Sequence, residues 1–250
     1  MAMSSTLTTV RAFLTGREAG SKTRHRNVQG GGTRAIVLGA GDGLLTNVSL
    51  VLGVAGASAG PSTVRLAGVA GLLAGAFSMG AGELVSMRAQ HEMTQRELQV
   101  ERDELRDEPE AERRELAGMF RQRGLSVEDA EVVSRILSTN ASVAFDAHAR
   151  FELGIDPEAS GAAGRAAVLS FFAFGLGAVL PLLPWFFTRG LAAIVDSIVI
   201  GAVAALGLGA LIGASASRSV WRSALRQLAV ATLAAGVTYG VGHLLGVSAT

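Results

Sequence analysis

Residues 64–87, VRLAGVAGLLAGAFSMGAGELVSM, decide the class of this protein. Arg65 and Glu83 are the only charged residues in the stretch. A helix needs about 20 mostly apolar residues to cross a hydrocarbon core about 30 Å thick, because each residue rises about 1.5 Å. The stretch therefore predicts a helix that spans a membrane.

Four other stretches satisfy the same requirement of length and apolarity. Together with residues 64–87 they predict five spans, the other four being Ala35–Ala57, Ala166–Phe187, Leu191–Ala214 and Leu225–Val247. The whole chain agrees, since 49 % of its residues are hydrophobic, only 17 % are charged, and the mean hydropathy is +0.40. Glycine is abundant inside the spans, as is typical of membrane helices that pack at close range. We expect an all-α membrane protein.

A charged insert separates the second span from the third. About three quarters of all Asp and Glu residues lie between Glu92 and Asp156, although the chain carries a net charge of only +1. Helix propensity and the breakers Pro109 and Gly124 predict three helices there. Their expected bounds are Arg88–Arg106, Glu110–Arg123 and Val127–Leu153.

The distribution of arginines predicts the orientation. The basic residues of the first 33 positions and the cluster Arg218, Arg222 and Arg226 favour a cytoplasmic location by the positive-inside rule. Five spans then leave the C-terminus outside. The predicted division is a flexible basic tail (1–33), spans one and two (34–88), a three-helix cytoplasmic metal-binding domain (89–160), and spans three to five (161–250).

Acidic residues of the insert are spaced for a metal site. Two pairs, Glu101 with Glu104 and Glu112 with Glu115, are three residues apart, so each pair shares one helix face. With Glu152, and with His148 one turn before it, they predict a site for divalent ions bound mainly through oxygen. The alternative is a solvated helix face on which arginines balance the glutamates, and spacing alone favours this alternative.

Polar residues inside the first two spans are candidates for an ion pathway. Asp42 lies eight residues after Arg34, about 12 Å into the membrane, where a carboxylate costs several kcal/mol unless it is paired, protonated or hydrated. Counting back from Arg88 places Met79 at nearly the same depth on an antiparallel helix, with Glu83 one turn nearer the cytoplasm. Asn47 would add a carbonyl oxygen. The alternatives are packing for Met79 and a hydrogen-bonded structural role for the carboxylates.

Several chemistries find no support in the sequence. There is no cysteine, so metal ligands must be carboxylates, His or Met. No nucleophile–base pair or cofactor motif is present, so we expect neither an enzyme nor a prosthetic group, and no nucleic-acid partner. Asp196, in the fourth span, has either a functional or a helix-packing role.

Motifs spread along the chain resemble one family. They are Gly41-Asp42-Gly43-Leu44 in the first span, residues 78–86 (SMGAGELVS) in the second, Pro109-Glu110-x-Glu112 through Arg123-Gly124-Leu125 in the insert, Glu152-Leu153-Gly154, and Pro181-Leu182-x-Pro184. In this order they resemble the vacuolar iron transporter family over roughly residues 34–247.

The resemblance implies a function and roles for these residues. Members of that family are five-span homodimers in the lipid bilayer that exchange cytosolic Fe²⁺, and often Mn²⁺, for protons. By resemblance, Asp42 and Met79 line the pathway at the dimer interface, and Glu83 lies at its cytoplasmic mouth. The family's cytoplasmic metal-collecting site would comprise Glu101, Glu104, Glu112, Glu115 and Glu152.

Two departures from the family pattern bear on the ion. His148 and Ala149 stand where plant members carry a pair of methionines, so the collecting site has fewer soft ligands to select against Mn²⁺ or Zn²⁺. Gly71 stands where some members carry an acidic residue near the outer part of the second span. The alternatives to a proton-coupled iron exporter are mainly a manganese exporter, or a membrane-anchored metal sensor without transport. Composition favours a bacterial cell membrane.

Overall fold

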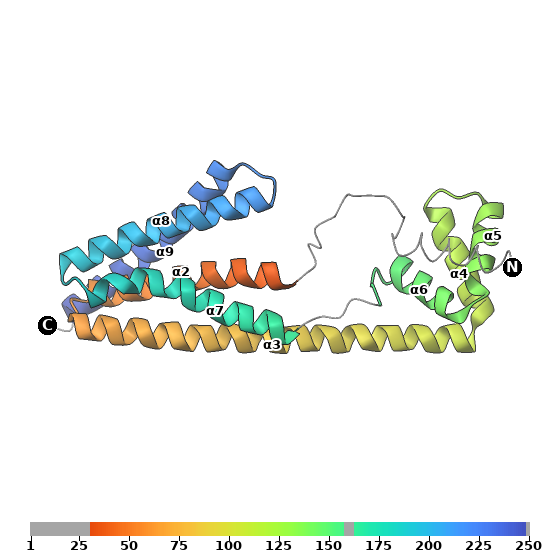
Figure 1. The fold of residues 1–250 in the computed structure, drawn as a ribbon, viewed down its shortest axis with the longest axis horizontal. Helices are drawn as coiled ribbons and strands as arrows, with labels where there is room; N and C mark the ends of the chain where they lie inside the picture. Colours follow the sequence, from red (N-terminus) through yellow and green to blue (C-terminus); the bar gives the residue numbers. More distant parts are fainter. Residues whose placement is uncertain (1–30, 158–162, 249–250) are drawn as a thin grey trace. The chain divides into compact units, whose positions relative to one another are not determined.

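The computed structural model describes residues 31–157 and 163–248. Over these residues the secondary structure is helical, with no strand. The helices are α2 (Gly31–Gly56), α3 (Pro61–Asp107), α4 (Pro109–Gln122), α5 (Val127–Ser138), α6 (Ala141–Phe151), α7 (Ala163–Leu182), the 3₁₀ turn η1 (Leu183–Phe186), α8 (Leu191–Ser215) and α9 (Val220–Ser248) (Figure 1). The predicted tail, residues 1–33, lies almost wholly outside the described residues.

Five helices are long and apolar enough to cross a membrane: α2, α3, α7 with η1, α8 and α9. They coincide with the five predicted stretches, so the prediction of an all-α, multi-pass membrane protein is confirmed. The second of them, α3, continues without a break from the apolar stretch through residue 107, as the lack of a breaker before Pro109 predicts.

The described residues form two compact units. One, the membrane unit, comprises residues 31–87 and 163–248, with the apolar part of α3 and the other four spans. The other, the insert unit, comprises residues 88–157, with the charged end of α3 and α4 to α6.

Helices α2 and α7 lie side by side within the membrane unit (Figure 1). Their contact depends on two glycines. A Cβ at Gly43 would collide with the backbone carbonyl of Phe174, and one at Gly177 would collide with that of Ala40. The two backbones therefore touch directly, which small residues make possible between membrane helices.

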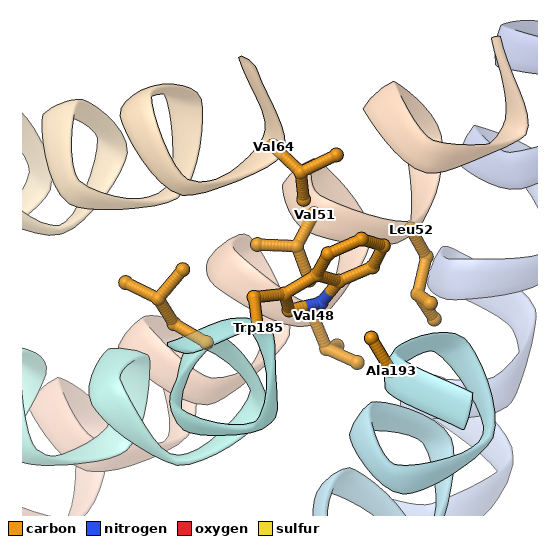
Figure 2. Close-up of a cluster of buried hydrophobic side chains, with 7 residues drawn as sticks. Val48, Val51, Leu52, Val64, Trp185 and Ala193 are labelled. Atoms are coloured by element: carbon orange, nitrogen blue, oxygen red, sulfur yellow. The ribbon is translucent and has the colours of Figure 1, made fainter. Parts of the chain in front are cut away.

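A buried cluster joins α2 to η1 and the start of α8. Figure 2 shows the indole of Trp185 among Val48, Val51 and Leu52. The Nε1 of Trp185 donates a hydrogen bond to the Ser197 hydroxyl over 2.9 Å. That hydroxyl in turn donates to the carbonyl oxygen of Pro181 over 2.7 Å, so the polar groups in this apolar cluster are satisfied.

The insert unit differs from the three predicted helices. The expected helix Val127–Leu153 is wrong, because the chain breaks between α5 and α6. Asn140 caps α6, its side-chain oxygen accepting hydrogen bonds from the amides of Ser142 and Val143. Thr139 donates its hydroxyl to the carbonyl of Ile136 at the end of α5. Such side chains compete with the helix backbone and favour a helix boundary.

The three helices α4, α5 and α6 enclose a small apolar core. Its most buried residues are Leu116, Ala130 and Ala147. The ring of Phe120 packs edge-on against that of Phe151 with centroids 5.3 Å apart. This core fixes the positions of the polar side chains that α4 and α6 carry beside it.

Candidate metal sites

The membrane unit has a cavity of about 350 Å³ between α2 and α3. Its wall includes Asp42, Met79 and Glu83, the three residues predicted to line a pathway. Thr46, Gly75, Ser78, Gly82 and Phe174 complete the wall. The sequence predicted that Asp42, Met79 and Glu83 lie at similar depths in the membrane, and the three side chains do line one cavity. Their role in transport stays a prediction.

Helical spacing explains how the wall forms. Asp42 and Thr46 are four residues apart and share one face of α2. On α3, Gly75, Ser78 with Met79, and Gly82 with Glu83 follow one another at steps of three or four. Small residues in this series leave the space that the cavity occupies. Phe174 closes one side, with its ring against Gly75, where a Cβ would overlap the ring.

Among the described residues, the carboxylates of the cavity make no ion pair. Within the described ranges, no Lys, Arg or His forms a salt bridge with Asp42 or Glu83. Asp42 is exposed on the membrane unit and Glu83 half-buried. An ionised carboxylate facing lipid costs several kcal/mol, so this face needs water, a cation or another protein surface. The thioether of Met79, half-buried beside the carboxylates, adds a soft ligand that late transition metals accept.

Asn47, the fourth predicted pathway residue, is not part of the cavity wall. It is fully buried, and its amide nitrogen donates to the carbonyl oxygen of Ala178 on α7 over 2.6 Å. The carbonyl oxygen of Asn47 has no hydrogen-bond partner among the described residues. Gly71 of α3 lies close by, since a Cβ there would be 3.5 Å from that oxygen. The visible role of Asn47 is to join α2 to α7.

Asp196 also lies outside the cavity. The hydroxyl of Thr188 donates to its carboxylate over 3.2 Å, at the junction between η1 and α8. This contact supports the helix-packing role among the two that the sequence left open.

The insert unit gathers four metal-ligating side chains. Glu101 of α3, Glu112 of α4, His148 of α6 and Glu152 after it each offer one ligand atom, and these atoms all lie within 4.8 Å of one another. We call these four residues the insert cluster. His148 is at its centre, since its Nδ1 lies 3.0 Å from Glu101 Oε1, 3.0 Å from Glu152 Oε2 and 3.6 Å from Glu112 Oε2.

The separations suit one divalent ion. Two ligand atoms about 2.1 Å from a metal lie about 3 Å apart at right angles and about 4 Å apart across it. The distances from His148 Nδ1 to the three glutamates, 3.0, 3.0 and 3.6 Å, fall in this range. A neutral imidazole and three carboxylates are ligands that Fe²⁺, Mn²⁺ and Zn²⁺ all accept.

Burial makes the insert cluster unfavourable without a cation. Glu101 is 2 % exposed and His148 is fully buried. When Nδ1 carries the imidazole proton, it has a single hydrogen to share between Glu101 and Glu152, and the aligned hydrogen bond is the one to Glu152. Within the described part of the chain, Glu101 Oε1 has no hydrogen-bond partner. A buried carboxylate oxygen in that state calls for a counter-ion.

The same burial perturbs the glutamates. Desolvation, helped by the nearby Glu152 carboxylate and opposed by His148, raises the pKa of Glu101 to about 7. Desolvation also raises the pKa of Glu112, with His148 opposing the shift. Protons therefore compete with a metal ion for the Glu101 carboxylate near neutral pH, and the raised pKa of Glu112 makes that carboxylate easier to protonate than an ordinary glutamate.

Arginines do not neutralise the insert cluster. Arg106 pairs with Asp103 and Asp107, and Arg113 pairs with Glu110 and Glu131. In residues 31–157 and 163–248, no Arg or Lys forms a salt bridge with any glutamate of the cluster. The two other candidate arginines are engaged elsewhere: Arg102 stacks on the ring of Phe145, and Arg114 donates to the carbonyl oxygen of Glu110. This arrangement counts against the solvated, charge-balanced face.

Two predicted ligands lie at the edge of the insert cluster. Glu104 and Glu115 are exposed and are not among the four residues whose ligand atoms converge. They are close enough to act by charge, since Glu104 helps to raise the pKa of both Glu101 and Glu112, and Glu115 that of Glu112. They would serve in attracting cations rather than in closing the coordination shell.

Sequence reasoning missed part of the cavity wall. Thr46, Ser78 and Phe174 were not among the candidates, although they line the cavity. The signal for Thr46 was present, because it lies one helical turn after Asp42. Phe174 belongs to a different span, and nothing in its own sequence context indicates which helix it contacts.

Comparison with known proteins identifies the family. A model of the VIT family matches residues 33–243. Vacuolar iron transporter 1 of Oryza sativa subsp. japonica is 31 % identical over 209 residues, or 83 % of this chain and 83 % of the relative. Vacuolar iron transporter 1 of Arabidopsis thaliana is 31 % identical over 207 residues, or 82 % and 83 %.

A protist relative gives the same result. The vacuolar iron transporter of Acanthamoeba castellanii is 33 % identical over 231 residues, or 88 % of this chain and 82 % of the relative. These relatives have the names of transporters rather than enzymes, which confirms the expectation that the chain is not an enzyme. The match extends over both units, and the chain therefore belongs to the VIT family.

Proposed function

We propose that this protein exports ferrous iron from the cytoplasm across the membrane in exchange for protons. The observation that carries the proposal is the cavity between α2 and α3, where Asp42, Met79 and Glu83 share one wall. Relatives about 30 % identical over most of the chain are named vacuolar iron transporters, and this supports iron as the first substrate.

The cavity suits a divalent transition metal by charge and by ligand type. A bare divalent ion cannot enter a low-dielectric pore unless nearby charges neutralise it, and Asp42 with Glu83 supplies two negative charges. The Met79 thioether favours Fe²⁺ over Mg²⁺ and Ca²⁺, which prefer oxygen alone. Together these side chains would hold the ion and select it.

Proton exchange follows from the same carboxylates. An ion arriving from the cytoplasm displaces the protons of Asp42 and Glu83, and protons from an acidic far side later displace the ion. One pair of residues then performs both halves of the exchange, so no separate proton pathway is needed.

A second copy of the chain would complete the pathway. Asp42 is exposed on the membrane unit, and exposure to lipid is the least favourable environment for a carboxylate. A homodimer that pairs the α2–α3 cavities would cover both faces and bring two sets of ligands together. The family resemblance implies this arrangement.

In this scheme the insert cluster collects metal ions. Three carboxylates converge on His148 with no Arg or Lys partner among the described residues, so the insert unit would bind metal ions in the cytoplasm. The exposed Glu104 and Glu115 would extend the negative field around it.

Two other functions remain as alternatives. The insert cluster has three oxygen donors and one nitrogen, a set that Mn²⁺ accepts as readily as Fe²⁺, and this favours manganese as a second ion or as the main one. A membrane-anchored metal sensor would need only the insert unit. The unpaired carboxylate of Asp42 in α2 argues against it, because a simple anchor gains nothing from that charge.

Transport by purified protein in liposomes tests the proposal. With an acidic interior, wild-type protein should drive uptake of Fe²⁺ and Mn²⁺, and collapse of the pH gradient should slow it. Asp42→Ala and Met79→Ala should each reduce the initial rate at least tenfold. The matched control is Asp196→Ala, which removes a carboxylate from a span but not from the cavity wall. Normal flux in the Asp42 variant would refute the mechanism, and metal binding without flux in the wild type would favour the sensor.

A further inference from the structure

A second hollow in the membrane unit lies at the turn between α8 and α9. It has a volume of about 360 Å³ and is lined by Arg218, Ser219, Arg222, Ser223 and Arg226. It shares no residue with the cavity between α2 and α3. The transport mechanism proposed above gives it no role.

The three arginines of the hollow have no acidic partner among the residues that the structure describes. Arg222 and Arg226 are four residues apart on α9 and so share one helix face, while Arg218 lies in the turn just before the helix. All three are exposed. Within residues 31–157 and 163–248, none of them forms a salt bridge with an Asp or Glu. Like charges four residues apart repel one another, and an anion bound between them would remove that repulsion.

Ser223 gives the hollow a fixed polar floor. It is 8 % exposed, and it packs on α8, where a Cβ at Gly213 would lie 3.0 Å from its Oγ. Its hydroxyl makes no hydrogen bond within the described part of the chain. Ser223 lines the hollow together with the three arginines, and a serine hydroxyl can donate a hydrogen bond to an anion there.

The α9 terminus adds to the positive potential. The first backbone amides of a helix point outward and carry a partial positive charge, which favours phosphate groups. Ser219 lies just before α9, and its hydroxyl accepts only a long 3.5 Å contact from the amide of Arg222. The three arginines, Ser223 and Ser219, the residue before α9, thus line the same hollow.

The surroundings indicate which molecule presents the anion. The hollow joins two candidate spans, α8 and α9, so it lies where a membrane surface meets water. Trp221, next to it in sequence, is 68 % exposed, and exposed tryptophans are enriched at the level of lipid headgroups. Anionic phospholipids supply phosphoryl groups at that level, and basic pockets beside membrane helices bind them.

We propose that this hollow binds a phosphoryl group and that an anionic phospholipid presents it. Arginines that only set the orientation of a membrane protein need a charge and no particular geometry. The buried serine distinguishes the two cases, because it contributes to binding while carrying no charge.

Native mass spectrometry of the full-length protein in a neutral detergent tests the proposal. Wild-type protein should retain phosphatidylglycerol in preference to phosphatidylcholine. Arg222→Gln combined with Arg226→Gln should abolish the preference. Ser223→Ala leaves the net charge unchanged and should weaken retention about tenfold, as expected for loss of a hydrogen bond to a charged group. Arg189→Gln, in the turn before α8, is the matched control and should bind as the wild type does.

A parallel arm offers inorganic phosphate in place of lipid. If phosphate displaces phosphatidylglycerol only at millimolar concentration, the result supports a lipid site. If the protein binds phosphate tightly and shows no preference for phosphatidylglycerol over phosphatidylcholine, the proposal is overturned. Equal retention by wild type, the Arg222/Arg226 double variant and the Arg189 variant also overturns the proposal. So does unchanged retention by Ser223→Ala. Each variant is first compared with the wild type by helical circular dichroism and elution volume, so that loss of binding is measured on folded protein.

Discussion

Replacement of Glu101 by Gln should change metal binding, its pH dependence and the stability of the insert unit together. With a pKa of about 7, the carboxyl is about nine-tenths ionised at pH 8 and about one-tenth ionised at pH 6. Only the carboxylate is a metal ligand. The apparent Kd of the wild type should therefore rise about tenfold between pH 8 and pH 6, or about 1.4 kcal/mol. The Gln variant should bind weakly and lose most of this dependence.

Although Glu101→Gln should weaken metal binding, it should make the metal-free insert unit more stable at pH 8. The pKa of Glu101 is higher in the folded protein than its ordinary value of 4.5, so the folded state holds more protons than the unfolded state between these values. The resulting stability is present below pH 4.5 and is lost as the pH rises toward 7. At pH 8 the buried carboxylate destabilises the metal-free protein, and Glu101→Gln should raise its melting temperature.

Manganese titration followed by electron paramagnetic resonance measures the binding, because free Mn²⁺ gives a six-line signal that is lost on binding. The titrations use full-length protein carrying Asp42→Asn, so that the insert site is measured alone, and thermal unfolding is followed with and without Mn²⁺. A Gln variant that is less stable than its parent without metal at pH 8, or that keeps a tenfold pH dependence, would refute this account of Glu101.

Three further predictions concern other residues. His148→Ala should weaken Mn²⁺ binding by the insert unit at least tenfold in the same titration. The control is His91→Ala, because His91 is an exposed histidine outside the insert cluster, and this variant should bind Mn²⁺ as its parent does. Equal effects of the two substitutions would exclude a central role for His148. Gly43→Ala should lower the thermal stability by about 1–3 kcal/mol through overpacking, while Gly175→Ala, where a Cβ would meet no atom within 4 Å, should change it little. Asn140→Ala should destabilise α6 by about 1 kcal/mol, seen as faster amide hydrogen exchange in α6, and unchanged exchange would contradict its capping role.

The spans were predictable because their signal is local. Length and apolarity alone identify a membrane helix, and the start of α8 at Leu191 agrees with the sequence. The boundary between α5 and α6 was missed because Thr139 and Asn140 are tolerated inside a helix by propensity. The boundary between α5 and α6 also depends on the packing of α6 against the core around Leu116, and this packing is not visible in the sequence.

The sequence indicated that acidic side chains of the insert could form a metal site, but not which of the glutamates converge. Glu101 and Glu104 share a helix face, yet three residues advance about 300° around the axis, which leaves them about 60° apart. When Glu101 is buried, Glu104 is left at the rim. Which member of each pair points inward depends on the packing of α4 and α6, and that is not visible in the spacing. For the same reason His148 looked marginal in sequence and is central in space.

Asn47, whose role in the pathway stays a prediction, lies outside the cavity wall for a geometric reason. Depth along α2 made it a pathway candidate, but depth does not specify direction around the helix. Five residues beyond Asp42, it is rotated about 140° away from that carboxylate. Its side chain therefore meets α7 rather than the cavity.

The direct backbone contact between α2 and α7 limits how the transport unit can move. With no side chain between Gly43 and the carbonyl of Phe174, or between Gly177 and that of Ala40, the two helices form one closely packed pair. Helices α2 and α7 therefore form one packed unit, and Asp42 is part of it on α2. In the transport mechanism proposed above, a displacement of α3, which holds Met79 and Glu83, would change the access to the cavity and also the distance between the ion's ligands.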